Sequence, residues 1–172
     1  MVIAAIGEDR PGLVDRLSGW ILDSGCSIAD SRMMVMGGEF AVLLSASGDQ
    51  ESLAKIERQL DEIQKQLGMT LSIKRTKPKE AAANLLSYVV EVVALDHPGI
   101  VHDVASFFSQ RNINIQDLST SSYAAAHSGT PMFSIQMSLD IPADSQIQEL
   151  CQEFLGYCDR LNLDGVIKPI NG

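Results

Sequence analysis

The chain has 172 residues, of which 45% are hydrophobic and 20% are charged, and its formal net charge is −9. This size and composition are typical of one medium or two small folded domains with apolar cores. No apolar run reaches 18 residues, and the apolar stretch 2–6 has neither a basic segment before it nor a cleavage site after it. We therefore expect a cytoplasmic protein with no membrane span and no export signal.

The negative charge is concentrated in the second half of the chain. Residues 1–79 contain 10 Lys and Arg against 11 Asp and Glu, whereas residues 80–172 contain 3 against 11. Nucleic-acid binding draws much of its affinity from basic side chains that neutralise phosphates. Direct binding to DNA is therefore disfavoured.

Three cysteines, Cys26, Cys151 and Cys158, stand outside any Cys-x-x-Cys pair or histidine cluster. Their odd number and spacing favour a reducing compartment over a disulfide framework. Cys151 and Cys158 are seven residues apart within an apolar helical stripe. We expect reduced core thiols and no metal site.

An internal repeat organises the sequence. The segment Asp-Arg-Pro-Gly-Leu-Val at 9–14 recurs as Asp-His-Pro-Gly-Ile-Val at 96–101, a shift of 87 residues. The match extends beyond this motif to cover some twenty residues, with Leu17, Trp20, Ile21 and Ile28 corresponding to Val104, Phe107, Phe108 and Ile115. The repeat predicts a first domain at 1–76, a linker at 77–84 and a second domain at 85–172.

Each copy shows the same order of strand and helix patterns. A short apolar strand precedes the Pro-Gly motif, and a helix beginning at Pro11 or Gly12 follows it, with a stop at Gly25 in copy one and Asn112 in copy two. In copy one the apolar stripe of this helix is expected at Leu13, Val14, Leu17, Trp20 and Ile21. The Gly37-Gly38 pair predicts a hairpin turn in copy one. The expected strands lie at 2–6, 27–36, 39–47, 70–75, 88–95, 114–123, 132–141 and 163–168.

A second amphipathic helix follows each hairpin, with apolar spacing across residues 53–67 and 147–161. Each copy is therefore strand, helix, strand, strand, helix, strand. That order is typical of the α+β, ferredoxin-like βαββαβ arrangement, an antiparallel sheet with its helices on one face.

No catalytic constellation accompanies these elements. The sequence has no phosphate-binding Walker loop, no G-x-S-x-G and no H-E-x-x-H. Cys26 as a nucleophile is an alternative, but its repeat partner is Ile113, and apolar packing explains both residues. We expect a protein that is not an enzyme and has no catalytic residues.

The Asp-x-Pro-Gly turn is the candidate binding feature. Free backbone N–H groups at a helix N-terminus favour a carboxylate, and Asp9 or Asp96 could accept from an ammonium group. Such a turn could hold both ends of an α-amino acid. The alternative is that aspartate and proline simply start the helix, and the occurrence of the turn in both copies leaves both interpretations open.

Together, the Asp-x-Pro-Gly-Leu/Ile-Val turn and the following Gly-Cys-Ser-Ile-x-Asp or Asn-Ile-Asn-Ile-x-Asp segment resemble the ACT domain, over nearly the whole chain. The resemblance implies two tandem ACT-type domains without a cofactor. It places ligand contacts on the two turns and on the start of a strand in copy two: Asp9, Arg10, Gly12, Leu13, Asp96, His97, Gly99, Ile100, Asn114 and Ile115. Copy one has Ser27 where such sequences often carry asparagine, so the two sites need not be equivalent.

Within the family, the chain is similar to bacterial tandem ACT regulators of glycine cleavage genes. That resemblance implies a repressor controlled by a small amino acid, glycine, that acts through a DNA-binding transcriptional activator of the LysR type. Two alternatives stay open: a sensor subunit of an amino-acid or folate enzyme, and a ligand-independent assembly module. The exposed sheet edges would be covered either within one chain or in a homodimer.

Overall fold

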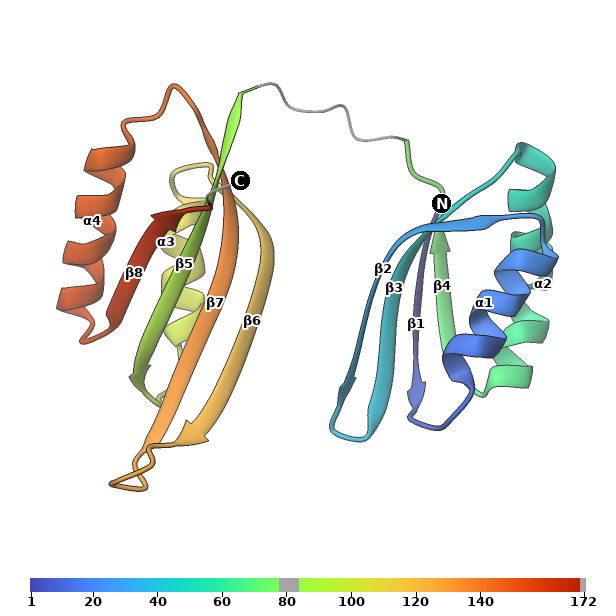
Figure 1. Cartoon of the computed structure of the whole chain (residues 1–172), viewed down its shortest axis with the longest axis horizontal. Coiled ribbons are helices and arrows are strands. Elements are labelled where there is room, and N and C mark those ends of the chain that lie inside the picture. Colours follow the sequence, from blue (N-terminus) through green and yellow to red (C-terminus); the bar gives the residue numbers. More distant parts are fainter. Residues whose placement is uncertain (78–83, 171–172) are drawn as a thin grey trace. The chain divides into compact units, whose positions relative to one another are not determined.

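The computed structural model describes residues 1–77 and 84–170, and it divides into two compact units between residues 80 and 81. Most of the predicted linker at 77–84 lies outside the described residues. Figure 1 shows that each unit has a sheet with its helices packed on one face. The predicted α+β architecture is confirmed in both units.

The first unit contains four strands and two helices. They are β1 (Val2–Glu8), α1 (Leu13–Asp23), β2 (Ser27–Met36), β3 (Glu39–Ser47), α2 (Gln50–Leu67) and β4 (Thr70–Lys74). The second unit repeats the order as β5 (Leu85–Leu95), α3 (Ile100–Ser109), β6 (Asn114–Ala124), β7 (Pro131–Pro142), α4 (Ile147–Arg160) and β8 (Asp164–Pro169).

Both sheets have the same topology, in which all strand pairs are antiparallel. The strand order is β2-β3-β1-β4 in the first unit and β6-β7-β5-β8 in the second. The predicted Gly37-Gly38 turn joins β2 and β3, and both glycines have positive φ, at 61° and 87°. The first and third strands of each unit are central in its sheet. The turns after β1 and β5 therefore lead from the middle of each sheet to the start of α1 and α3.

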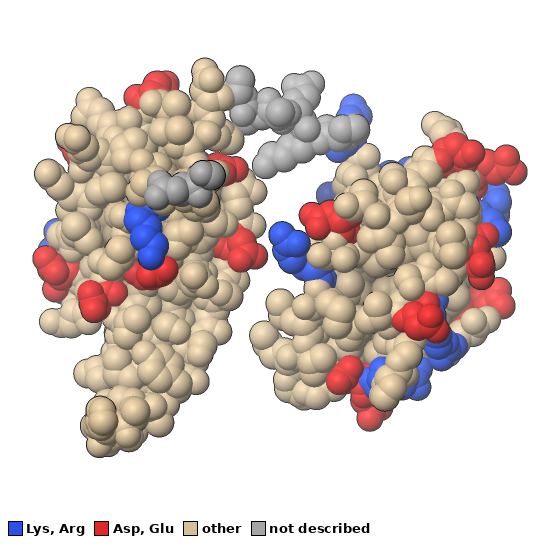
Figure 2. Space-filling view, viewed as in Figure 1, with Lys and Arg blue, Asp and Glu red and all other residues tan. Residues whose placement is uncertain are grey.

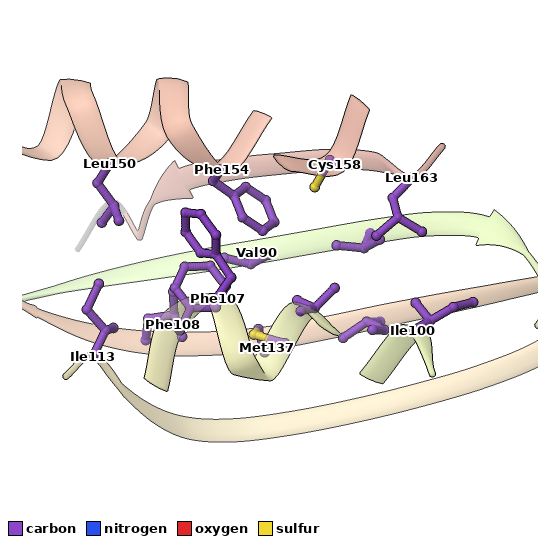
Figure 3. Packing of buried hydrophobic residues seen from close by; sticks show 14 of the residues in the cluster. Val90, Ile100, Phe107, Phe108, Ile113, Met137, Leu150, Phe154, Cys158 and Leu163 are labelled. Carbon is purple, nitrogen blue, oxygen red and sulfur yellow. The ribbon is translucent and has the colours of Figure 1, made fainter. Parts of the chain in front are cut away.

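Each unit has its own apolar core between the sheet and the helices. In the second unit, Figure 3 shows Phe154 of α4 pointing toward Phe107 and Phe108 of α3, above Val90 of β5. The rings of Phe107 and Phe154 have centroids 5.3 Å apart in an edge-to-face arrangement. Trp20 takes the place of Phe107 in the first unit, where it is also buried.

The start of α1 and the burial of two side chains, Val14 and Cys151, differ from the sequence predictions. α1 begins at Leu13, and Gly12 is its N-cap rather than its first residue. Val14, predicted to lie on the apolar stripe of α1, is 50% exposed. Cys26 and Cys158 are buried as predicted, whereas Cys151 is only partly buried because it lies at the rim of the α4 stripe. None of the described helices is long and apolar enough to span a membrane.

Candidate functional site

The two Asp-x-Pro-Gly turns share a backbone geometry that requires glycine. Gly12 and Gly99 have φ values of 90° and 103°, in the left-handed region that side chains rarely adopt. A Cβ at Gly12 would meet no atom within 4 Å, so the glycine serves the backbone angle rather than close packing. Within the described chain no side chain caps α1 or α3. The first N–H groups of both helices therefore remain available to an anion.

The aspartates of the turns are exposed, and their backbones are fixed by the neighbouring hairpin. The Asp9 N–H donates to the Gly38 carbonyl at 3.0 Å, and the Asp96 N–H donates to the Pro131 carbonyl at 3.0 Å. The backbone of each aspartate is thus fixed, and its side chain lies at the protein surface. Either could accept from an ammonium group, as the sequence predicts.

Arg10 has a structural partner. Its guanidinium donates to the backbone carbonyl of Leu67, the last residue of α2, where free carbonyls carry the negative end of the helix dipole. His97, at the equivalent position, is exposed, and its Nδ1 lies 3.1 Å from the adjacent Pro98 carbonyl. The two positions predicted to contact a ligand are therefore used differently in the two units.

Leu13 and Ile100 belong to the cores. Each is 2% exposed, so its side chain is packed inside its unit, and the residue can offer a ligand only its backbone N–H.

A surface hollow of about 530 Å³ lies at the first turn. It brings four predicted residues together with residues of α1, β2 and β3, and its lining is Asp9, Arg10, Pro11, Gly12, Leu13, Val14, Asp15, Met33 and Phe40.

Asn114 and Ile115 lie in a different place from the turn of their own unit. They line a groove of about 360 Å³ between α3 and β6, together with His102, Ala105, Ser106, Ser109 and Ile113. The turn precedes α3 and Asn114 follows it, so the two features are separated by a helix of 10 residues, or about 15 Å. A single unit does not bring all the predicted ligand residues together.

The first unit has the same groove at equivalent positions. This α1–β2 groove, of about 410 Å³, is lined by Asp15, Ser18, Gly19, Ile21, Leu22, Cys26, Ser27 and Ile28. Every lining residue of the α3–β6 groove corresponds to one of these at a shift of 87 residues. Sequence reasoning missed the groove. The repeat keeps a polar residue in both units at only two of its positions, Asp15 or His102 on the helix and Ser27 or Asn114 at the start of the strand.

The two grooves differ in chemistry. Asp15 contributes a carboxylate in the first unit, where the second unit has the imidazole of His102. Ser27 in the first groove is replaced by Asn114 in the second, whose amide can both donate and accept. The α3–β6 groove is therefore able to hydrogen-bond a carboxylate, whereas the carboxylate of Asp15 would repel one.

The cysteines are in environments that lower their reactivity. Cys26 is 4% exposed, and burial, followed by the nearby charge of Asp49, raises the pKa of its thiol. Since the thiolate is the reactive form, these effects oppose the alternative of a nucleophilic Cys26. In the described part of the chain, no three or more His, Cys, Asp or Glu side chains gather in a way that could hold a metal ion.

The repeated fold and its repeated groove define a protein of two tandem ferredoxin-like domains, and comparison with known proteins gives the family. Profiles described as the ACT domain match residues 1–74 and 88–122. The chain belongs to the ACT-domain proteins, with one such domain in each unit.

The relatives extend over the whole chain. It is 29% identical to the glycine cleavage system transcriptional repressor of Escherichia coli over 171 residues, which cover 99% of this chain and 90% of that protein. A crystal structure of a candidate glycine cleavage system transcriptional repressor matches with a TM-score of 0.77 and 28% identity, covering 99% of this chain and 96% of the other. A protein of Galdieria sulphuraria with 21% identity and a TM-score of 0.79 shares the fold, with 99% and 97% of the two chains covered. The chain is therefore homologous to a regulatory protein.

Proposed function

We propose that this chain is a non-catalytic regulator that binds a small amino acid, glycine, and controls transcription of glycine cleavage genes through a DNA-binding activator. The observation that carries the proposal is the similarity to a glycine cleavage transcriptional repressor across both units, with 90% of that protein's length covered. A shared full length supports a shared role more strongly than a shared domain would.

The charge distribution supports action through a protein rather than on DNA directly. The second half of the chain has a net charge of −8 and the first half −1. In Figure 2, blue Lys and Arg atoms are sparse on the visible face of the second unit. Such a surface has few groups to neutralise phosphates. A DNA-binding activator, of the LysR type, would supply the contact with the operator.

The α3–β6 groove is the proposed amino-acid site. The His102 imidazole and the Asn114 amide offer donors to the ligand carboxylate, and Ser106 and Ser109 supply hydroxyl groups. The groove volume of about 360 Å³ accommodates a ligand as small as glycine. The turn residues Asp96 and Gly99 are a separate proposed contact, because they lie beyond the other end of α3.

The repeat offers a matched pair of variants for this site. His102→Asp makes the second groove resemble the first, and we expect glycine binding measured by calorimetry to fall at least tenfold. Asp15→His is the reciprocal change at a position that is likewise exposed, and we expect no loss of affinity. Equal effects of the two changes would contradict the assignment of the site to the second unit.

The partner is tested with purified components. A LysR-type activator bound to its operator DNA would be mixed with this protein, with and without glycine, and complex formation followed by gel shift. We expect a supershifted complex whose amount depends on glycine. Glycine-independent association would support an assembly module, and stable co-purification with an amino-acid or folate enzyme would support a sensor subunit.

A further inference from the structure

A hollow of about 440 Å³ lies between the two helices of the first unit. The lining of this α1–α2 hollow includes Trp20 and three acidic residues, Asp15, Asp23 and Glu62. None of the three carboxylates belongs to an ion pair formed among the described residues. The one basic residue of the lining, Arg16, donates to a backbone carbonyl near the end of α2, at 3.0 Å. Negative charge therefore exceeds positive charge in the hollow, which favours a cation.

Trp20 carries a hydrogen-bond donor that the described part of the chain leaves unpaired. Its side chain is 5% exposed, and its indole N–H has no acceptor among the described residues. A buried indole N–H usually has a partner, because an unsatisfied donor costs free energy. An oxygen atom of a ligand would supply that partner. The indole is also the aromatic side chain on which an organic cation packs best.

The second unit holds a cation of its own at the equivalent place. Arg111 corresponds to Ser24 at the repeat shift of 87 residues, as Phe107 corresponds to Trp20. The guanidinium of Arg111 lies 3.8 Å from the centroid of the Phe107 ring. It also forms an ion pair with Glu153, at 2.8 Å. A guanidinium therefore covers the aromatic ring on the helical side of the second unit.

The first unit keeps the local hydrogen bond of this arrangement and lacks the cation. The Ser24 hydroxyl donates to the Trp20 carbonyl at 2.8 Å, just as the guanidinium of Arg111 donates to the carbonyl four residues before it, at 2.9 Å. The apolar residues of α2 match those of α4 at a shift of 94 residues, which makes Gln59 the counterpart of Glu153. Gln59 accepts from the Ser24 hydroxyl at 3.3 Å. Among the described residues, no arginine or lysine packs over the Trp20 ring.

We propose that the α1–α2 hollow binds the guanidinium of an arginine side chain in a bound polypeptide, which takes the place that Arg111 fills in the second unit. The guanidinium packs against Trp20 where this residue lines the hollow, and it pairs with Glu62 and Asp23. The indole N–H then gains an acceptor from a neutral peptide carbonyl. Free arginine fits less well, because the acidic lining repels its carboxylate. The site is separate from the amino-acid groove of the second unit.

The chain offers a direct reporter for this site. Trp20 is its only tryptophan, so tryptophan fluorescence and the indole N–H signal in NMR spectra both report on the hollow. The probe is N-acetylarginine amide, which has a guanidinium and two peptide groups but no carboxylate, titrated into the full chain at low ionic strength. We expect a saturable change in both signals. The matching citrulline compound, which has nearly the same shape without the charge, should bind about tenfold more weakly, the scale of one charge-assisted hydrogen bond.

A pair of acidic-to-amide changes tests the role of the lining. Glu62→Gln removes one carboxylate of the hollow, and we expect it to weaken binding of the probe about tenfold. Asp61→Asn makes the same change of charge at an exposed position of α2 outside the lining, and it should leave the affinity unchanged.

The repeat supplies a variant that fills the hollow from within. Ser24→Arg combined with Gln59→Glu introduces the ion pair of the second unit without altering the net charge, and it should abolish binding of the probe. The second unit accommodates this pair, and thermal unfolding checks that the first unit does so too.

Three results would overturn the proposal: no saturable change with the arginine amide, equal affinity for the citrulline compound, or equal effects of Glu62→Gln and Asp61→Asn. Tighter binding of free arginine than of its blocked amide would assign the hollow to a small molecule and would likewise overturn the polypeptide ligand.

Discussion

The guanidinium of Arg10, in the turn after β1, donates to the carbonyl of Leu67, 57 residues later at the end of α2. A cation at a helix C-terminus satisfies a free carbonyl and interacts favourably with the helix dipole. The contact joins the candidate ligand turn of the first unit to its second helix. It makes Arg10 part of the fold in that unit, while His97 in the second unit has no such role.

Replacing Arg10 should therefore affect stability. We expect Arg10→Ala to lower the free energy of unfolding by about 1 kcal/mol, the usual scale for one partly exposed hydrogen bond from a charged donor. His97→Ala is the matched control and should leave stability within about 0.5 kcal/mol of the parent. Urea unfolding measures both. A stable Arg10→Ala protein that has lost its response to amino acids would show instead that Arg10 contacts the ligand.

Gly165 in β8 is fixed by close packing against α4. A Cβ there would lie 2.5 Å from the Cys158 Sγ and 3.2 Å from an edge carbon of Phe154. We expect Gly165→Ala to destabilise the second unit by about 1–3 kcal/mol, since overpacking forces buried groups to move. Thermal unfolding of the variant measures the loss.

Two companion variants separate overpacking from a general intolerance of alanine. Gly156→Ala lies within α4, with its nearest neighbour at 3.9 Å, and should stabilise the helix by up to about 1 kcal/mol. Cys158→Ala removes the clashing sulfur, so the double variant with Gly165→Ala should lose less stability than the two single losses combined. Simple additivity would contradict the packing explanation.

The Cys158 thiol gives a pH dependence with a definite sign. Burial, followed by the nearby charges of Asp159 and Asp164, raises its pKa to about 11, from an ordinary value of 9.0. The folded protein therefore holds this proton more tightly than the unfolded chain. Its contribution to stability is complete below pH 9 and is lost as the pH rises from 9 toward 11.

The same shift slows thiol chemistry in the folded state. At pH 8 the thiolate fraction of Cys158 should be about 100-fold below that of an ordinary cysteine, because each pKa unit is a factor of ten. Titration with a thiol reagent should show slow reaction in native buffer and fast reaction in denaturant. Rapid native modification assigned to Cys158 by mass spectrometry would contradict this account.

The sequence predicts the fold well because its strongest signals are local or repeated. Alternation over 132–141 and the glycines at 37 and 38 determine strand and turn without reference to distant residues. The exposure of Val14 could not be predicted in this way, since helical spacing does not define how wide a stripe the sheet covers.

The candidate site was predictable only in its parts. The motif identified the two turns and the start of β6, and it explains the left-handed glycine of each turn, Gly12 and Gly99. The distance between Asn114 and the Asp96 turn follows from the direction of α3, and the Arg10 contact joins segments far apart in the chain. Neither relationship is encoded in residue spacing. The matching α1–β2 and α3–β6 grooves emerge only when both units are folded.

Thermal unfolding of the full chain against a panel of free amino acids tests the central claim most directly. A ligand that binds only the folded state stabilises it, by about 2.7 kcal/mol at 100 times its dissociation constant. We expect a saturable, selective rise in the melting temperature with glycine, and its loss in His102→Asp. The absence of any shift with all amino acids up to millimolar concentration would contradict an amino-acid-responsive regulator.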